Sequence, residues 1–213
     1  MREARKYILL HGLGQSSESW LEVIKELNPE WDILCPDMVE WMVGKEPCYD
    51  TLYRELESFC RQFEEPLCLC GLSLGAILAM DFAAGHAERV QSLVLIGAQY
   101  KMPRTLLKLQ DIIFRFMPGR AFGKMGFQKT DFISLCRSMA ELDIENRLRQ
   151  ITARTLVICG EKDFANKAAS AKLAGSLPRA ELVLMQDSGH EVNHDASVIL
   201  GKEIKRFWER LQS

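Results

Sequence analysis

One short stretch, residues 67–80, constrains the fold of this chain more than any other. Leu67 to Cys70 are apolar and are bounded by a proline and a glycine, which predicts a short buried strand. Ser73 to Ala84 carry apolar and small residues at helical spacing, so a helix is expected directly after that strand. The junction, Gly71-Leu-Ser-Leu-Gly75, has the pattern G-x-S-x-G, which holds a serine in a sharp, strained turn between closely packed glycines.

This turn predicts a chemical role for Ser73. It lifts the serine hydroxyl clear of the sheet and places it at a helix N-terminus, where unpaired N–H groups and the helix dipole favour developing negative charge. The alternative is a tight strand-to-helix turn that contains a serine by chance. A nucleophilic serine needs a base and an orienting acid, so those two partners decide between the interpretations.

Length and composition exclude several classes of function. A chain of 213 residues fits one domain, and 47% apolar with 26% charged residues is typical of a soluble globular protein. The formal net charge is −2 and the basic residues are scattered, so no nucleic-acid partner is expected. No apolar run reaches membrane-spanning length, so no membrane span is expected either. The sequence leaves the oligomeric state open.

The N-terminal segment and the cysteines predict a cytoplasmic location. Residues 1–6 are charged and lack the apolar core of a signal peptide. The cysteine count is odd, at seven, and most of these residues fall in apolar, strand-like segments where a free thiol behaves as a small buried hydrophobe: Cys35, Cys68, Cys70 and Cys159. Free buried thiols are typical of proteins from a reducing compartment.

Six strand-like apolar segments recur along the chain, at residues 6–10, 31–35, 67–70, 91–97, 154–160 and 181–185. Near-continuous apolar runs indicate strands that are buried on both faces. Strands that alternate with helices indicate a parallel sheet with right-handed crossovers. The predicted fold is therefore α/β, with a doubly wound, mostly parallel sheet of about six strands and helices on both faces. Ligands bind such sheets at the carboxyl ends of the strands.

An insertion at residues 99–150 interrupts this alternation, because a simple crossover needs far fewer residues. Its first half, Leu106 to Met117, is strongly apolar, and Thr130 to Ala140 are expected to form a helix. The insertion leaves from the carboxyl end of a strand, which favours a small helical lid over the site. An extension of the core is the alternative. We expect one domain, residues 1–213, with residues 99–150 as its lid.

The base and the acid are sought after the last two strands. His190, in Asp187-Ser-Gly-His190, lies on a loop just past the carboxyl end of the last strand and is the candidate base for Ser73. Asp163, in Gly160-Glu-Lys-Asp163, follows the preceding strand and is the candidate orienting acid. The other three histidines, His11, His86 and His194, are less suitably placed.

With these residues in place, the chain resembles the α/β-hydrolase superfamily over nearly its whole length. The order Ser73, Asp163, His190 is that of the family's catalytic triad, and Gly71 to Gly75 match its nucleophile elbow. The resemblance implies that Ser73 attacks, that His190 moves the proton and that Asp163 orients the imidazole. It also implies chemistry with no metal or organic cofactor.

The loop His11-Gly12-Leu13-Gly14 resembles the family's oxyanion loop. By this resemblance, the backbone N–H groups of Leu13 and Leu74 hold the oxyanion, with His11 and Gly12 shaping the loop for substrate. Two departures from the family are visible. The chain begins at the strand before His11, so the family's first two strands are not expected, and the short lid disfavours a large lipid substrate.

A competing motif overlaps the candidate base. His190-Glu-Val-Asn-His194 matches H-E-x-x-H, in which two histidines one helical turn apart bind zinc. Ser188-Gly189 immediately before it disfavours a helix that includes His190, and Asp195 is expected to cap the final helix instead. A zinc hydrolase using His190, Glu191 and His194 is therefore a remote alternative.

The functional expectation is a serine hydrolase that cleaves a small or medium carboxylic ester through a covalent acyl-enzyme. The same fold also hosts carbon–carbon bond hydrolases, lyases and ligand receptors, so the ester chemistry rests partly on the resemblance. A lyase, a carbon–carbon bond hydrolase and a small-ligand receptor with little turnover are the alternatives.

Overall fold

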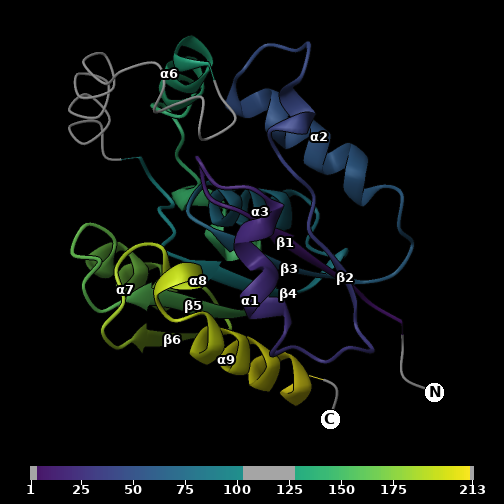
Figure 1. The fold of residues 1–213 in the computed structure, drawn as a ribbon, viewed down its shortest axis with the longest axis vertical. Helices are drawn as coiled ribbons and strands as arrows, with labels where there is room; N and C mark the ends of the chain where they lie inside the picture. Colours follow the sequence, from purple (N-terminus) through teal and green to yellow (C-terminus); the bar gives the residue numbers. More distant parts are fainter. Residues whose placement is uncertain (1–3, 103–127, 212–213) are drawn as a thin grey trace.

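Six parallel strands form a single sheet in the computed structural model, which describes residues 4–102 and 128–211 (Figure 1). The strand order is β2-β1-β3-β4-β5-β6, so the strand that leads to Ser73 lies near the middle. The strands are β1 Lys6–Leu10, β2 Asp32–Leu34, β3 Leu67–Leu72, β4 Val90–Ile96, β5 Arg154–Gly160 and β6 Ala180–Met185. This sheet confirms the α/β fold predicted from the alternating segments.

Helices cover both faces of the sheet. They are α1 Leu21–Ile24, α2 Tyr49–Cys60, α3 Leu74–Gly85, α6 Lys129–Ser138, α7 Lys167–Ser176, α8 Val192–Asp195 and α9 Ser197–Arg210, with the 3-10 turns η1 Ser17–Trp20, η2 Glu40–Met42 and η3 Glu145–Gln150. In Figure 1, α2 and α6 lie together above the sheet, and α9 lies below it.

Alternating strand side chains build two separate hydrophobic cores. Successive side chains of a strand point to opposite faces. Ile8 and Leu10 therefore join one buried cluster, with residues of α2 and α3, while Tyr7 and Leu9 join the other, with residues of α1 and α9. Because both faces are covered, the central strands are apolar at nearly every position, which is why they read as continuous runs in the sequence.

The strand register brings the loops that carry the candidate residues to one edge of the sheet. Leu10 pairs with Gly71, and Leu72 pairs with Ile96. Farther along the sheet, Gly160 at the end of β5 pairs with Met185 at the end of β6. All strands are parallel, so the residues that follow β1, β3, β4, β5 and β6 emerge at the same carboxyl edge.

The second half of the insertion is helical, as expected. The helix predicted at Thr130 to Ala140 is α6, and Ser138 Oγ accepts a hydrogen bond of 2.8 Å from Tyr49 N at the start of α2. The apolar first half, Leu106 to Met117, lies outside the described residues, so the single-domain and lid assignments stay predictions. No helix in the described ranges has the length and hydropathy of a membrane span.

The segment after Ser16 forms the turn η1 and the short helix α1, which ends at Ile24. One local expectation differs from the structure. Asp195 does not cap the final helix, whose N-cap is Ala196. The Asp195 carboxylate instead accepts a hydrogen bond of 2.6 Å from Gly189 N, which ties the loop before His190 to α8.

Candidate active site

Ser73 sits in the strained turn that the sequence pattern predicts. Its backbone has φ 53° and ψ −111°, a region that costs a residue with a side chain about 1–3 kcal/mol. The turn is held by a 2.8 Å hydrogen bond from Ser73 N to Ile96 O and by contacts that only glycine allows. A Cβ on Gly75 would lie 2.2 Å from Leu10 O, and one on Gly71 would lie 2.3 Å from Gly75 C. The Ser73 side chain makes no capping hydrogen bond to α3, which leaves the hydroxyl for other partners.

Asp163 and His190 form a hydrogen-bonded pair across two loops. His190 Nδ1 lies 2.7 Å from Asp163 Oδ2, with the imidazole partly exposed and the carboxylate buried. Because an ionised carboxylate only accepts, Nδ1 carries a proton, and in the neutral ring the lone pair is then on Nε2. Burial alone would raise the pKa of Asp163, but hydrogen bonds from His190 and Asn166 hold that pKa below its ordinary value. The acid is therefore ionised at neutral pH.

Asn166 is a second partner of the acid that sequence reasoning missed. Its Nδ2 lies 2.9 and 2.8 Å from the two oxygens of Asp163, and its Oδ1 accepts a 2.7 Å hydrogen bond from Gln99 Nε2. Asn166 Nδ2 also lies 3.1 Å from His190 Nδ1, so two N–H groups surround one buried carboxylate. An asparagine three residues after an acid is too common a pattern to have indicated this role.

The end of β4 places the Asp163–His190 pair beside the turn that carries Ser73. Gly97 follows Ile96, which binds Ser73 N, and a Cβ on Gly97 would lie only 2.9 Å from His190 Cε1 and 3.5 Å from Asp163 Oδ2. Gly97 also has φ 58°, a left-handed conformation that favours glycine. The structure therefore packs the imidazole against the same strand end that anchors the Ser73 turn.

In the loop after β1, His11 and Gly12 are held by separate hydrogen bonds. His11 is buried; its Nε2 accepts a 3.0 Å hydrogen bond from Met38 N, so its Nδ1 donates to Gly12 O at 2.9 Å. Burial lowers the pKa of His11, so the ring is neutral and acts as a bridge between two loops. Gly12 N donates to Gln15 Oε1 at 3.1 Å and is thus occupied.

Two backbone N–H groups remain as candidate oxyanion donors. In the described ranges, the N–H of Leu13 has no backbone hydrogen bond outside regular elements. Leu74 is the first residue of α3, and N–H groups in the first turn of a helix have no partner within it. These are the two donors that the sequence resemblance implied.

Comparison with known proteins decides the family. The model of a family described as "Alpha/beta hydrolase family" matches residues 7–199. The chain belongs to this family. The hydrolase is 22% identical to monoacylglycerol lipase abhd6-B of Xenopus laevis, in an alignment that covers 97% of this chain and 76% of the lipase. It is also 22% identical to a putative 2-succinyl-6-hydroxy-2,4-cyclohexadiene-1-carboxylate synthase of Bacillus subtilis, with 94% of this chain and 89% of the synthase covered.

A solved structure agrees with the fold of the hydrolase. The enol-lactonase from Burkholderia xenovorans LB400 superposes with a TM-score of 0.84 at 18% identity, covering 97% of this chain and 92% of the lactonase. At this identity the likeness concerns the fold alone. It confirms the α/β-hydrolase fold that the sequence resemblance implied.

The H-E-x-x-H match does not form a zinc-binding helix in the hydrolase. Helix α8 begins at Val192 with Glu191 as its N-cap, so His190 and His194 are not one turn apart on one helix. His190 Nδ1 is engaged by Asp163, and Glu191 Oε1 accepts from Gln15 Nε2 at 3.3 Å. Among the residues that the structure describes, no three His, Cys, Asp or Glu side chains are grouped to hold a metal ion.

We expect Glu191→Gln to retain at least half of the wild-type kcat, because the substituted amide side chain keeps an Oε1 that can still accept from Gln15 Nε2. We also expect ester hydrolysis to be the same with and without EDTA. The indifference to EDTA follows because Asp163 engages the His190 Nδ1 atom. A steady-state assay on a soluble ester checks both, and loss of activity in EDTA with recovery on adding zinc would overturn this interpretation of the motif.

The buried cysteines of the chain have a structural role. All seven cysteines are free thiols. Burial raises the pKa of Cys60 to about 12 and that of Cys68 to about 11, so both stay protonated at neutral pH. A protonated, buried thiol is neither a nucleophile nor a metal ligand, which agrees with their interpretation as small apolar side chains.

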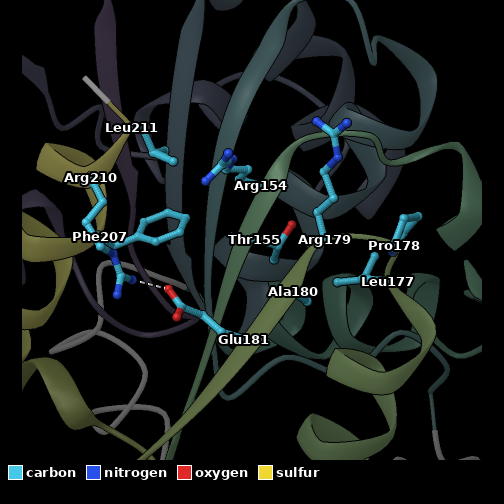
Figure 2. Close-up of a pocket in the computed structure, with 10 residues that line it drawn as sticks. All are labelled: Arg154, Thr155, Leu177, Pro178, Arg179, Ala180, Glu181, Phe207, Arg210 and Leu211. Carbon is cyan, nitrogen blue, oxygen red and sulfur yellow. Dashed lines mark hydrogen bonds and ion pairs between the residues drawn. The ribbon is translucent and has the colours of Figure 1, made fainter. Parts of the chain in front are cut away.

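Two surface hollows lie at opposite edges of the sheet. One, of about 710 Å³, lies at the amino ends of β5 and β6; in Figure 2, Arg154 and Arg179 line it, and Arg210 of α9 is paired with Glu181. It is therefore remote from the carboxyl edge. The other, of about 630 Å³, borders the loop after β1 and the loop after His190, with Gln15, Asp37 and Glu191 in its wall. Only the second adjoins the candidate site.

Proposed function

We propose that this protein is a serine hydrolase that cleaves a small or medium carboxylic ester through a covalent acyl-enzyme. The observation that carries the proposal is the buried, ionised Asp163 bound to His190 Nδ1 beside the strand end that anchors the Ser73 turn. In the neutral imidazole this pairing places the lone pair on the second ring nitrogen, which is the state that a general base needs.

The proposed reaction has two matched halves. Ser73 Oγ attacks the ester carbonyl carbon while His190 Nε2 takes the hydroxyl proton, and the imidazolium then gives that proton to the leaving alcohol. Water repeats the sequence on the acyl-enzyme, which releases the carboxylic acid and restores Ser73. In both halves the Leu13 and Leu74 N–H groups stabilise the oxyanion, at roughly 2.7–4 kcal/mol for one donor.

The comparisons support ester chemistry without specifying a substrate. A monoacylglycerol lipase, by its name, acts on an ester bond. The match to a putative cyclohexadiene-carboxylate synthase favours a lyase as the second candidate. The two candidates differ in one measurable property, because an ester hydrolase acylates its serine and releases alcohol before acid.

Pre-steady-state kinetics test the proposal. With excess p-nitrophenyl butyrate and micromolar protein, we expect a burst of p-nitrophenol equal to the concentration of active sites, followed by slower turnover. This result requires acylation to be faster than deacylation, which an activated aryl ester favours. Absence of both burst and turnover on aryl esters from acetyl to octanoyl would contradict the esterase proposal.

The chain-length profile tests the size of the acyl pocket. Each buried methylene contributes about 0.8 kcal/mol, so kcat/KM should rise roughly fourfold per carbon until the pocket is full. We expect an optimum at short or medium chains and poor hydrolysis of palmitoyl esters. The predicted lid contributes through Phe114 and Phe116, which lie outside the described residues, so Phe114→Ala and Phe116→Ala should move the optimum. A flat profile that neither change affects would contradict a substrate-facing lid.

The proposed location and substrate class are those expected from the sequence. We propose a cytoplasmic enzyme with a small-molecule ester substrate, consistent with seven free thiols. The proposed reaction needs only the ester and water as reactants.

A further inference from the structure

Two buried side-chain amides join the oxyanion loop to the loop that carries the base. Gln15 Nε2 donates to Asn193 Oδ1 at 3.3 Å, and Asn193 Nδ2 donates back to Gln15 Oε1 at 3.1 Å. Asn193 is 1% exposed and Gln15 is 9% exposed, although 178 residues separate them in the sequence. The two amides thus form a reciprocal pair that holds two loops together.

The remaining N–H groups of both amides and the second acceptor site of Gln15 Oε1 are also used. Gln15 Oε1 accepts a second bond, of 3.1 Å, from Gly12 N, and Gln15 Nε2 donates to Glu191 Oε1 at 3.3 Å. Asn193 Nδ2 donates its other hydrogen to Ser19 O at 3.2 Å. A fully satisfied buried polar group tolerates little rearrangement, because each lost bond leaves a desolvated atom unpaired.

We propose that Gln15 and Asn193 are positioning residues that set the oxyanion loop and His190 relative to each other. Gln15 holds the Gly12 N–H and closes the turn in which Gln15 N donates to Gly12 O at 3.1 Å. That turn contains Leu13, the candidate oxyanion donor. Asn193 lies three residues after His190 at the start of α8, so the amide pair fixes the donor and the base as one unit. This inference rests on the proposed function, since it concerns the same reaction.

The mechanism predicts an effect on kcat with little effect on KM. Displacing a catalytic group by about 1 Å can lower the rate by roughly 100-fold, whereas loss of a whole oxyanion donor lowers kcat by about 10²–10³-fold. We therefore expect Gln15→Ala and Asn193→Ala to lower kcat by about 10- to 100-fold, with KM within about twofold. The double variant should be no worse than either single variant, because each already breaks the pair.

Asn193→Asp separates the amide chemistry from simple packing. Aspartate has the size of asparagine but no side-chain N–H group, so it loses the bonds to Gln15 Oε1 and Ser19 O. Its carboxylate oxygen then faces Gln15 Oε1, and both atoms are acceptors. We expect it to lose as much kcat as Asn193→Ala does. Gln91→Ala and Asn28→Ala are matched controls, because both residues lie away from the carboxyl edge: Gln91 is at the start of β4 and Asn28 follows α1.

The experiment compares these variants with the wild type in three measurements at one temperature, well below every unfolding midpoint. The first two are kcat, calculated per titrated active site, and KM, both for p-nitrophenyl butyrate. The third is the rate constant for modification of Ser73 by a fluorophosphonate. If Asn193→Ala does not fold, Gln15→Met, which keeps the side-chain volume, takes its place. The inference predicts that both kcat and the modification rate fall in the pair variants and not in the controls.

Three outcomes would overturn the inference, and they differ in what they imply for the proposed function. A wild type that hydrolyses esters and reacts with the fluorophosphonate, together with folded pair variants of unchanged kcat per active site, overturns the inference and leaves the proposed function standing. A wild type that does neither overturns both. A fall in Tm without a fall in kcat per active site assigns the amide pair to stability alone and also overturns the inference.

Discussion

Ser73→Ala is expected to lower kcat for ester hydrolysis by about 10⁴- to 10⁶-fold, the range found when one member of a catalytic triad is removed. Covalent catalysis cannot proceed without the hydroxyl. Alanine keeps the Cβ and therefore the same backbone strain at φ 53° as serine, so the fold and its unfolding midpoint should be nearly unchanged. The steady-state rate and a calorimetric Tm check the two parts of this prediction.

Ser176→Ala is the matched control for this change. Ser176 ends α7, is exposed, and donates its hydroxyl to Lys172 O at 2.8 Å, so its loss should leave kcat within about twofold of the wild type. Ester hydrolysis by Ser73→Ala at the wild-type rate would remove Ser73 from the mechanism.

Asp163→Asn is expected to lower kcat by about 10⁴-fold while KM changes little. The asparagine amide presents an N–H where the carboxylate accepted one, so it favours the histidine tautomer whose Nε2 is protonated and cannot act as a base. Its amide also faces the Nδ2 of Asn166, which now has one acceptor fewer. The kcat of Asp163→Asn and its pH profile measure this effect.

Asp187→Asn is the matched control, because Asp187 is the other acid near His190 in the sequence. Its side chain is exposed, and its Oδ1 lies 3.0 Å from Lys162 Nζ. It has φ 58°, which asparagine also tolerates. We expect nearly wild-type kcat. If Asp187→Asn proved as damaging as Asp163→Asn, the assignment of the acid would be wrong.

The depressed pKa of Asp163 also predicts how stability depends on pH. Burial opposes ionisation, but the hydrogen bonds from His190 and Asn166 prevail, so the folded pKa lies below the unfolded value near 3.8. The resulting stabilisation is present above that unfolded value and is lost as pH falls through the lower folded value. The difference in unfolding free energy between wild type and Asp163→Asn should therefore be larger at pH 7 than at pH 3. An unchanged difference would contradict the pairing.

The parts of the fold that the sequence predicts well are those set by local patterns. Continuous apolar runs located five of the six strands closely, and G-x-S-x-G located the turn at Ser73, because each depends on neighbouring residues alone. The strand at 31–35 is the weakest case, since β2 is an edge strand of three residues, Asp32–Leu34, that is only half buried. Its pattern is correspondingly less apolar.

The supporting contacts of the site are not predictable in this way. Asn166 packs against a histidine 24 residues away, and Gln15 pairs with Asn193 across nearly the whole chain. Polar residues of these types occur throughout the sequence, and only the parallel register brings these particular ones to the carboxyl edge. The hydrogen bond from Met38 N to His11 Nε2 likewise depends on where Met38 lies after β2, so the sequence placed His11 in the right loop without revealing this contact.

Covalent labelling tests the central claim most directly. The protein is treated with a fluorophosphonate and digested, and the modified peptide is sequenced by mass spectrometry. The account predicts one adduct per chain on Ser73, with parallel loss of ester hydrolysis, slower labelling in Asp163→Asn and no labelling in Ser73→Ala. An active protein that acquires no adduct, or an adduct on another residue that persists in Ser73→Ala, would contradict it.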